Sequence, residues 1–400
     1  MYFVKENNNR SQQQFEKTNQ SLFISVLETG GWHDEVVAAL ICSFGQLPNS
    51  HLQLFQRKSR YKVHNIMRAF NLKNPLPAAR NLSYFMSWDD LTQQWPDIVI
   101  STTCELDMRV FKNKMTFLLT RHHTYVFCVI HEADRWSMRR DRLEEAVSEW
   151  IRKDRIDFIA LSPHTGDYLL QHSLKNWKVV NNEGYRPRIR HFTPVFPVQL
   201  PSLDEKECWG IALQGSFRQG TRDYRMVFRE FSKLLYPHLN HKLSISNITL
   251  NLIGYGTRPM VPNIIRNNVM FHEGLNYYNF YSVLSRQLVL LPAFSSEIYL
   301  DRCASSTIPA SLIAGVPLVT TQKILNAYQY LTKEVVWFQE NNETEFDVIR
   351  RILKMSHEAR KQKIVLINAH TKHIINENTR LARKWTQSAL FRAGIRVNYI

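Results

Sequence analysis

The chain has 400 residues, 44% of them hydrophobic and 22% charged, and its formal net charge is +16. That composition is typical of an ordinary globular protein of two or three domains, and no run of about 18 apolar residues occurs, which excludes a transmembrane helix. The positive charge favours anionic partners: nucleotides, phospholipid headgroups or nucleic acid.

The segment 1–20 is polar and lacks the apolar centre of a signal peptide, so we expect it to be disordered. We expect a cytoplasmic protein, or one of the Golgi or ER lumen if a targeting segment precedes this chain. The cysteines are widely spaced, without a CxxC pair, so we expect neither a metal site nor a disulfide framework. We expect the cysteines to be buried free thiols. They are Cys42, Cys104, Cys128, Cys208 and Cys303.

The first half alternates strand-like and helix-like segments. A β-branched run at 21–27 is followed by helical spacing over 36–47, and a second helix is predicted at 142–153. Further strands are predicted at 51–55, 97–102, 124–130, 157–162 and 178–181. Such alternation predicts a parallel sheet covered on both faces.

A proline-rich stretch at 191–207 reads as a linker, and the alternation then restarts with a strand at 209–215 and a helix at 221–235. Further strands are expected at 248–254, 269–274, 287–294, 317–321 and 334–338, with a helix at 276–286. The sequence therefore predicts two doubly wound α/β domains, at 21–196 and 208–342, joined by a linker at 197–207. Residues 343–400 are predicted to form C-terminal helices.

In doubly wound sheets, ligands bind beyond the carboxyl ends of the strands, so the loops that follow strands are the candidate sites. The first such loop carries Gly30 and Gly31 ahead of a helix, where the backbone can approach an anionic ligand closely. The alternative is an ordinary tight turn. The pattern is not GxGxxG, so a nicotinamide dinucleotide fingerprint is absent.

The loop 131–136 follows a strongly apolar strand and offers Asp134, Glu132 and His131 as acid–base groups; the alternative is a solvated loop with salt bridges. The loop 215–222 places Arg218 and Arg222 between a strand and a helix, where guanidinium groups suit a diphosphate. The alternative for Arg222 is pairing with a carboxylate at the surface.

The stretch 304–321 reads ASSTIPASLIAGVPLVTT, with Ser305, Ser306 and Thr307 ahead of a helical run. Three hydroxyl residues exceed what a helix cap needs, so they favour a phosphate site over a cap. Because Pro309 disfavours helical dihedrals at Ile308, we expect the helix to begin near Pro309.

In combination these patterns resemble a glycosyltransferase of the GT-B architecture, over about residues 21–370. The order LNLIGYG (250–256), VMFHEGL (269–275), VLLPAF (289–294) and SSTIPASLIAGVPLV (305–319) is similar to the donor domain of that family, and GGWHDEVVAAL (30–40) to its first glycine loop. The resemblance implies two Rossmann-like domains that face a cleft.

The resemblance further implies transfer of a sugar from a UDP- or GDP-linked donor, bound by the second half, to a hydroxyl of a glycan, lipid or protein acceptor. It implies a reaction without a metal or a further cofactor. The predicted donor contacts are Arg218, Arg222, Ser305, Ser306, Thr307, Gly30, Gly31 and Glu297. Contact with an anionic membrane surface is a further expectation.

One departure concerns two glutamates of many retaining members, the second of which touches the ribose of the nucleotide. The corresponding positions here are Arg302 and Ala310, and Glu297 or Asp301 are the candidate substitutes. A non-catalytic GT-B-like binding protein is therefore one alternative. A basic nucleic-acid-binding protein is another, although no nucleic-acid motif is present and nucleic acid is not the expected partner.

Overall fold

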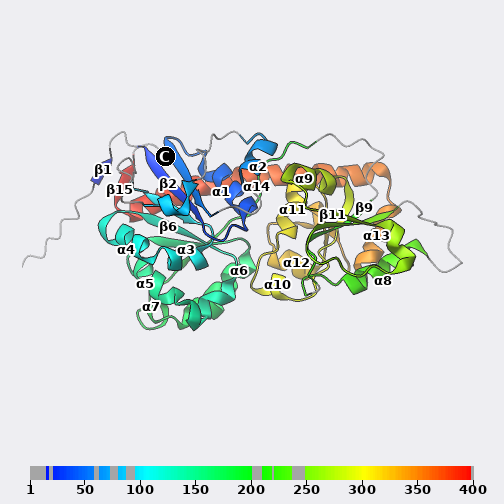
Figure 1. The fold of residues 1–400 in the computed structure, drawn as a ribbon, viewed down its shortest axis with the longest axis horizontal. Helices are drawn as coiled ribbons and strands as arrows, with labels where there is room; N and C mark the ends of the chain where they lie inside the picture. Colours follow the sequence, from blue (N-terminus) through cyan, green and yellow to red (C-terminus); the bar gives the residue numbers. More distant parts are fainter. Residues whose placement is uncertain are drawn as a thin grey trace, which may run out of the picture.

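The structure is a computed structural model that describes residues 15–17, 21–57, 63–72, 80–86, 95–200, 210–218, 220–236 and 248–397. Its elements form two α/β halves and a long C-terminal helix that runs beside both (Figure 1).

The first half is built on a parallel seven-stranded sheet of order β4-β3-β2-β5-β6-β7-β8. Its strands are β2 (Leu22–Glu28), β3 (Ser50–Gln56), β4 (Arg80–Asn81), β5 (Ile98–Ser101), β6 (Tyr125–Ile130), β7 (Ile156–Ala160) and β8 (Arg188–His191). Because the order reverses between β2 and β5, the carboxyl ends of these strands form a switch point where ligands are expected.

Helices cover both faces of this sheet, since its central strands are fully buried on both sides. The helices are α1 (Asp34–Phe44), α2 (Val63–Ala69), α3 (Cys104–Val110), α4 (Lys112–Arg121), α5 (Leu143–Arg152), α6 (Pro163–Tyr168) and α7 (Lys178–Asn181). One buried cluster joins the sheet to α1 and α2, and a second joins it to α3, α4 and α5.

The second half has a smaller parallel sheet of order β11-β10-β9-β12. Its strands are β9 (Gly210–Ser216), β10 (Thr249–Tyr255), β11 (Val269–Glu273) and β12 (Gln287–Leu290). Past β12, Leu290 bridges Leu318, and β13 (Val319–Thr320) pairs with β14 (Trp337–Phe338). The helices are α8 (Tyr224–Leu235), α9 (Tyr277–Ser285), α10 (Ile298–Asp301), α11 (Thr307–Ala314), α12 (Gln322–Ala327) and α13 (Glu345–Leu353).

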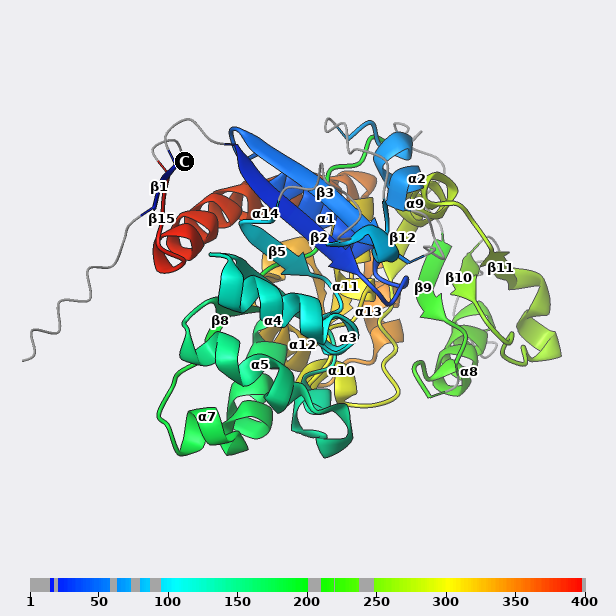
Figure 2. The same ribbon diagram turned by 60° about the vertical axis from the view of Figure 1, so that its left-hand side comes forward.

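The last helix, α14 (His357–Arg392), packs against both halves. Thr371 donates to the Leu312 carbonyl of α11 at 2.9 Å, and Asn378 donates to the Thr193 carbonyl of the first half at 2.7 Å. In Figure 2 this helix and the first-half sheet lie on one side of the molecule, and β9, β10 and β11 lie on the other.

The structure bears on the expectations for the N-terminal segment and for the linker. Phe15–Lys17 form strand β1, which pairs in parallel with β15 (Ile395–Val397), so these three residues are not disordered; the rest of 1–20 lies outside the described residues. Of the predicted linker, residues 197–200 have no regular secondary structure, and 201–207 lie outside the described residues.

The prediction of a strand at 178–181 is wrong, because this segment is the short helix α7. The free edge of β7 is taken instead by β8, a less apolar strand whose Arg188 and Arg190 both pair with the buried Asp157 of β7. Val179 meanwhile packs beside Trp177 in the core. The apolar residues of 178–181 indicated a buried segment, but they did not distinguish a strand from a helix.

The expectation of free thiols is wrong for two cysteines. Cys104 at the start of α3 and Cys128 in β6 form a disulfide buried in the first half. They are separated by 24 residues and meet because β6 lies beside β5, which leads directly into α3. Cys42 and Cys303 are free, and Cys208 lies outside the described residues.

Candidate functional site

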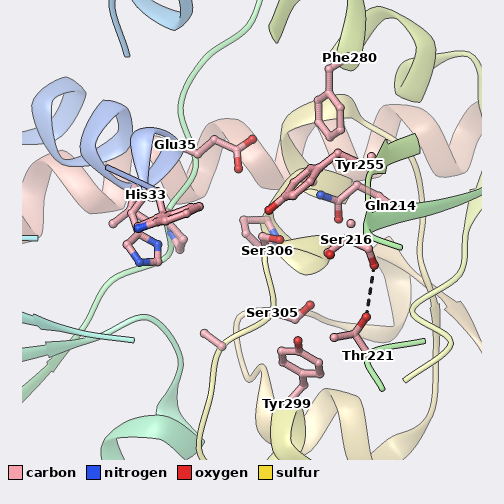
Figure 3. A pocket seen from close by; sticks show the side chains of 18 of the residues that line it. His33, Glu35, Gln214, Ser216, Thr221, Tyr255, Phe280, Tyr299, Ser305 and Ser306 are labelled. Carbon is pink, nitrogen blue, oxygen red and sulfur yellow. Dashed lines mark hydrogen bonds between the residues drawn. The ribbon is translucent and has the colours of Figure 1, made fainter. Parts of the chain in front are cut away.

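A cavity of about 1090 Å³ lies between the two halves, at the carboxyl ends of both sheets. The first half contributes the loop after β2 and the loop after β6. The second half contributes the loops after β9, β11 and β12, the last two residues of β10 and one side of α11. Figure 3 shows His33 on one side of this cavity and Ser216, Thr221 and Tyr299 on the other.

Arg222 is the most deeply buried cation on the cavity wall, with 5% of its surface exposed. Its Nη2 donates to Thr307 Oγ1 at 2.6 Å and to the Gln214 carbonyl at 3.1 Å, and its guanidinium lies over the ring of Phe294. Among the described residues Arg222 forms no ion pair, although the Glu345 carboxylate at the start of α13 is near enough to interact with it electrostatically. Burial therefore lowers the pKa of Arg222, and an anion in the cavity would restore the favourable charged state.

The start of α11 supplies hydroxyl groups to the same wall. The helix begins at Thr307, so the expectation of a start near Pro309 is wrong. Proline is tolerated there because the N–H groups of a first helical turn have no partner inside the helix. Ser306 is the N-cap residue, yet its side chain makes no capping hydrogen bond and is exposed to the cavity.

The three hydroxyl residues have different surroundings. Ser305 and Ser306 line the cavity, as Figure 3 shows. Thr307 is fully buried, and its hydroxyl donates to Gln214 Oε1 at 2.8 Å while it accepts from Arg222. Thr307 thus holds Arg222 and Gln214 in place. Arg218, the other predicted arginine, is exposed and lines the cavity.

The first glycine loop is held by side chains of its own half. The N–H of Gly31 donates to Glu28 Oε1 at 2.5 Å, and the N–H of Gly30 donates to Thr103 Oγ1 at 3.3 Å. Burial raises the pKa of Glu28 to about 7. Neither glycine is among the residues that line the cavity; Trp32 and His33, which follow them, are. Donor contacts from Gly30 and Gly31 stay a prediction.

The loop after β6 brings two of its three predicted acid–base residues to the cavity: His131 and Glu132. The buried Glu105 holds this loop, because its Oε1 accepts from the N–H groups of both residues. His131 Nε2 lies 2.7 Å from the Thr102 carbonyl and must donate to it, so its Nδ1 is the unprotonated nitrogen of the neutral ring. Burial lowers the pKa of His131 to about 4.

Asp134 and Glu297 are not among the residues of the cavity wall. Asp134 pairs with Arg302 at 3.2 Å, and Glu297 pairs with Lys323 at 3.4 Å. Their predicted roles in catalysis and donor binding rest on the sequence alone.

Several residues of the cavity wall had no assigned role in the sequence, among them Trp32, His33 and Glu35, which follow the paired glycines. Trp32 is 57% exposed, and the ring of His33 stacks on that of His131 with centroids 3.6 Å apart. Glu35 accepts a hydrogen bond of 2.5 Å from Tyr281 of the second half. The available signal was their position directly after the paired glycines at the end of the first strand, where a helix begins.

Within the described residues, no helix is long and apolar enough to cross a membrane. The described residues also contain no group of three or more His, Cys, Asp or Glu side chains that could hold a metal ion.

No family model matches the chain, and no curated protein sequence matches it. Solved structures do. Sucrose-phosphate synthase from Thermosynechococcus elongatus is 12% identical with a TM-score of 0.56, over 92% of this chain and 100% of that one. HepE from Anabaena, solved in complex with UDP-glucose, is 10% identical with a TM-score of 0.55, over 92% and 100% of the two chains.

At these identities the likeness concerns the fold. The similarity covers 92% of this chain and 100% of each solved chain, so it includes both α/β halves. The protein therefore has the GT-B glycosyltransferase fold that its sequence resembles.

Proposed function

We propose that this protein is a glycosyltransferase that moves a sugar from a nucleoside diphosphate donor to a hydroxyl acceptor. The observation that carries the proposal is the buried Arg222 guanidinium, which lines the cavity beside Ser305 and Ser306 and forms no ion pair among the described residues. A diphosphate adds negative charge beside this guanidinium and accepts hydrogen bonds from the Ser305 and Ser306 hydroxyls that line the cavity.

We propose a UDP-linked sugar as the donor. The support is that HepE, which shares the fold, was solved with UDP and with UDP-glucose. Sucrose-phosphate synthase, by its name, makes a sugar phosphate ester. The class of acceptor (glycan, lipid or protein) and contact with an anionic membrane stay predictions, and no observation favours nucleic acid as a partner.

In the proposed reaction, the bond between the sugar and the diphosphate breaks and the acceptor oxygen bonds to the sugar carbon. Negative charge accumulates on the leaving diphosphate, and Arg222 and Arg218 are placed to neutralise it. Because two guanidinium groups supply this charge, we propose that transfer needs no metal ion and continues in EDTA.

The acceptor hydroxyl loses a proton during transfer. If the configuration of the sugar inverts, a nearby base takes that proton. Glu132 and His131 are the predicted residues that line the cavity, and we propose them for this role ahead of Asp134, which pairs with Arg302. Loss of a general base lowers kcat by about 10²- to 10⁴-fold, so Glu132→Gln and His131→Ala identify it.

The test begins with thermal shift against UDP, GDP and ADP. A nucleotide at about a hundred times its Kd stabilises the fold by about 2.7 kcal/mol. UDP release from UDP-glucose and related donors is then followed with a panel of acceptors, with and without EDTA. Binding without turnover would favour the non-catalytic alternative, and the absence of any nucleotide effect would contradict the proposal.

A further inference from the structure

The cavity has two chemically different ends. Figure 3 shows Ser305 and Thr221 towards one end and Glu35 with Phe280 towards the other, and Ser306 lies between Ser305 and Glu35 in that view. The first end also holds Tyr299, Arg218 and Arg222, and its two guanidinium groups suit the diphosphate. The second end, here called the aromatic end, is lined by Tyr277, Phe280 and Tyr281 of α9.

A carboxylate at this second end is unexpected. Glu35 and Glu132 are the carboxylates among the described residues that line the cavity, and an anionic ligand would be repelled by either unless it offers a hydrogen-bond donor. Glu35 lies in the first turn of α1, where the helix dipole stabilises negative charge, while burial raises the pKa of Glu35 to about 6, so the carboxyl group is mainly ionised at neutral pH. We therefore expect the part of the ligand that lies beside Glu35 to donate hydrogen bonds to its carboxylate.

The side chain of Glu35 is held from the opposite half of the molecule. Tyr281 Oη donates to Glu35 Oε1 at 2.5 Å, and Tyr281 itself is fully buried against Phe70 and Phe196. The phenol fixes the orientation of the carboxylate while Glu35 still lines the cavity. A carboxylate accepts several hydrogen bonds, so this contact leaves acceptor capacity for a ligand.

Other walls of this end offer fewer acceptors. The side of α11 that follows Ser306 presents Pro309, Ala310 and Ile313. The Asn276 side chain accepts from Asn279 N to cap α9, and His272 bonds to Asn251. A ligand hydroxyl that lies between the diphosphate end and the aromatic end meets Glu35 as the strongest acceptor.

In a nucleoside diphosphate, the group between the diphosphate and the base is the ribose, with two vicinal hydroxyls. We propose that the Glu35 carboxylate, oriented by Tyr281, accepts hydrogen bonds from the ribose hydroxyls of the donor nucleotide. Glu35 thereby selects ribonucleotides over deoxyribonucleotides. Since Glu35 belongs to the first half and the phosphate contacts belong to the second, the bound nucleotide bridges the two halves. This inference rests on the proposed donor site.

The test compares the affinities of UDP and 2′,3′-dideoxy-UDP by isothermal titration calorimetry, for the full chain and for Glu35→Ala, Glu35→Gln and Tyr281→Phe. The full chain should bind UDP at least tenfold more tightly than the dideoxy compound, since a hydrogen bond to a charged group is worth about a factor of ten or more. Glu35→Ala should bring the ratio close to one, mainly by weakening UDP, and Tyr281→Phe should reduce it part of the way. Glu35→Gln keeps the size of the side chain and should lie between the full chain and Glu35→Ala.

The ratio separates a ribose contact from a general loss of folding, because a damaged site weakens both ligands equally. An unchanged ratio in Glu35→Ala would overturn the inference while UDP binding still supported the donor site. A lower kcat with an unchanged ratio would also overturn it and would assign Glu35 to the acceptor. If the full chain binds no UDP, the proposed donor site fails first, and the inference fails with it.

Discussion

At the scale of single residues, the site separates groups that face the ligand from groups that support them. Ser306 is an N-cap residue without a capping bond, so its hydroxyl is available to the cavity. Thr307, its neighbour, is enclosed and acts on Gln214 and Arg222 instead. The residue types were evident in the sequence, whereas the direction of each side chain follows from where the helix starts.

The first prediction concerns Arg222. Arg222→Met keeps apolar contact with Phe294 and removes the charge, so nucleotide binding should weaken by about 1.5–3 kcal/mol, against about 0.5–1.5 kcal/mol for Ser306→Ala. Calorimetric titration with UDP measures both. Arg225→Met, at an exposed position of α8 outside the cavity wall, removes the same charge and is the control.

Equal losses for Arg222→Met and Arg225→Met would show that binding depends on the net positive charge rather than on the site. A lower melting temperature with normal affinity in Ser306→Ala would mean that the hydroxyl stabilises α11 and does not bind phosphate.

At the scale of elements, the second-half sheet determines the position of the cavity wall that carries Arg218 and Arg222, where we propose that the diphosphate binds. Gly254 of β10 lies directly opposite Gly215 of β9 in the parallel register, and both line the cavity. A Cβ atom on Gly254 would lie 1.8 Å from the Gly215 carbonyl oxygen, a backbone atom that cannot rotate away. Two glycines at this place therefore let the strand ends approach each other beside the loop that carries Arg218 and Arg222.

The second prediction follows from that contact. Gly254→Ala should lower the free energy of unfolding by about 1–3 kcal/mol, the usual cost of overpacking, and should weaken UDP binding because the loop after β9 is displaced. Gly220→Ala is the control, since Gly220 also lines the cavity but a Cβ atom there meets nothing within 4 Å. Chemical denaturation and titration with UDP test both variants. Equal stability of the two would show that the strand ends separate without cost.

At the scale of the whole molecule, the two halves are connected by more than the chain between them. One buried cluster continues from the first-half sheet through α11 to α14. In this cluster the ring centroids of Trp385 and Phe127 are 6.5 Å apart. Asn378 of α14, itself buried, bonds to the backbone of the first half. The relative placement of the halves, and hence the cavity, thus depends on a helix from the far end of the chain.

The third prediction concerns a chain cut between the halves. With a protease site inserted between Leu200 and Gly210, cleavage should leave the fragments associated, because α14 of the second fragment stays packed on the first. Size-exclusion chromatography should give the elution volume of the uncut protein, and the fragments should separate in denaturant. Separation under native conditions would show that α14 contributes little to the association of the halves.

The sequence by itself determined the alternation of strands and helices and the two parallel sheets, while the anion site that it places after β12 stays a prediction. These features follow from local periodicity and from turn residues, which a single segment carries. It did not determine that 178–181 is helical, that Cys104 meets Cys128, or that Glu35 meets Tyr281.

Only the tertiary structure decided those contacts, because each depends on a partner remote in the chain. Tyr281 lies 246 residues from Glu35, and no local pattern in either segment specifies the other. For the same reason, the sequence predicted donor contacts from Gly30 and Gly31, whereas Trp32, His33 and Glu35 are the residues of this segment that line the cavity. Residue types identify what chemistry is available, whereas packing of α1, α9, α11 and α14 decides which groups share one cavity.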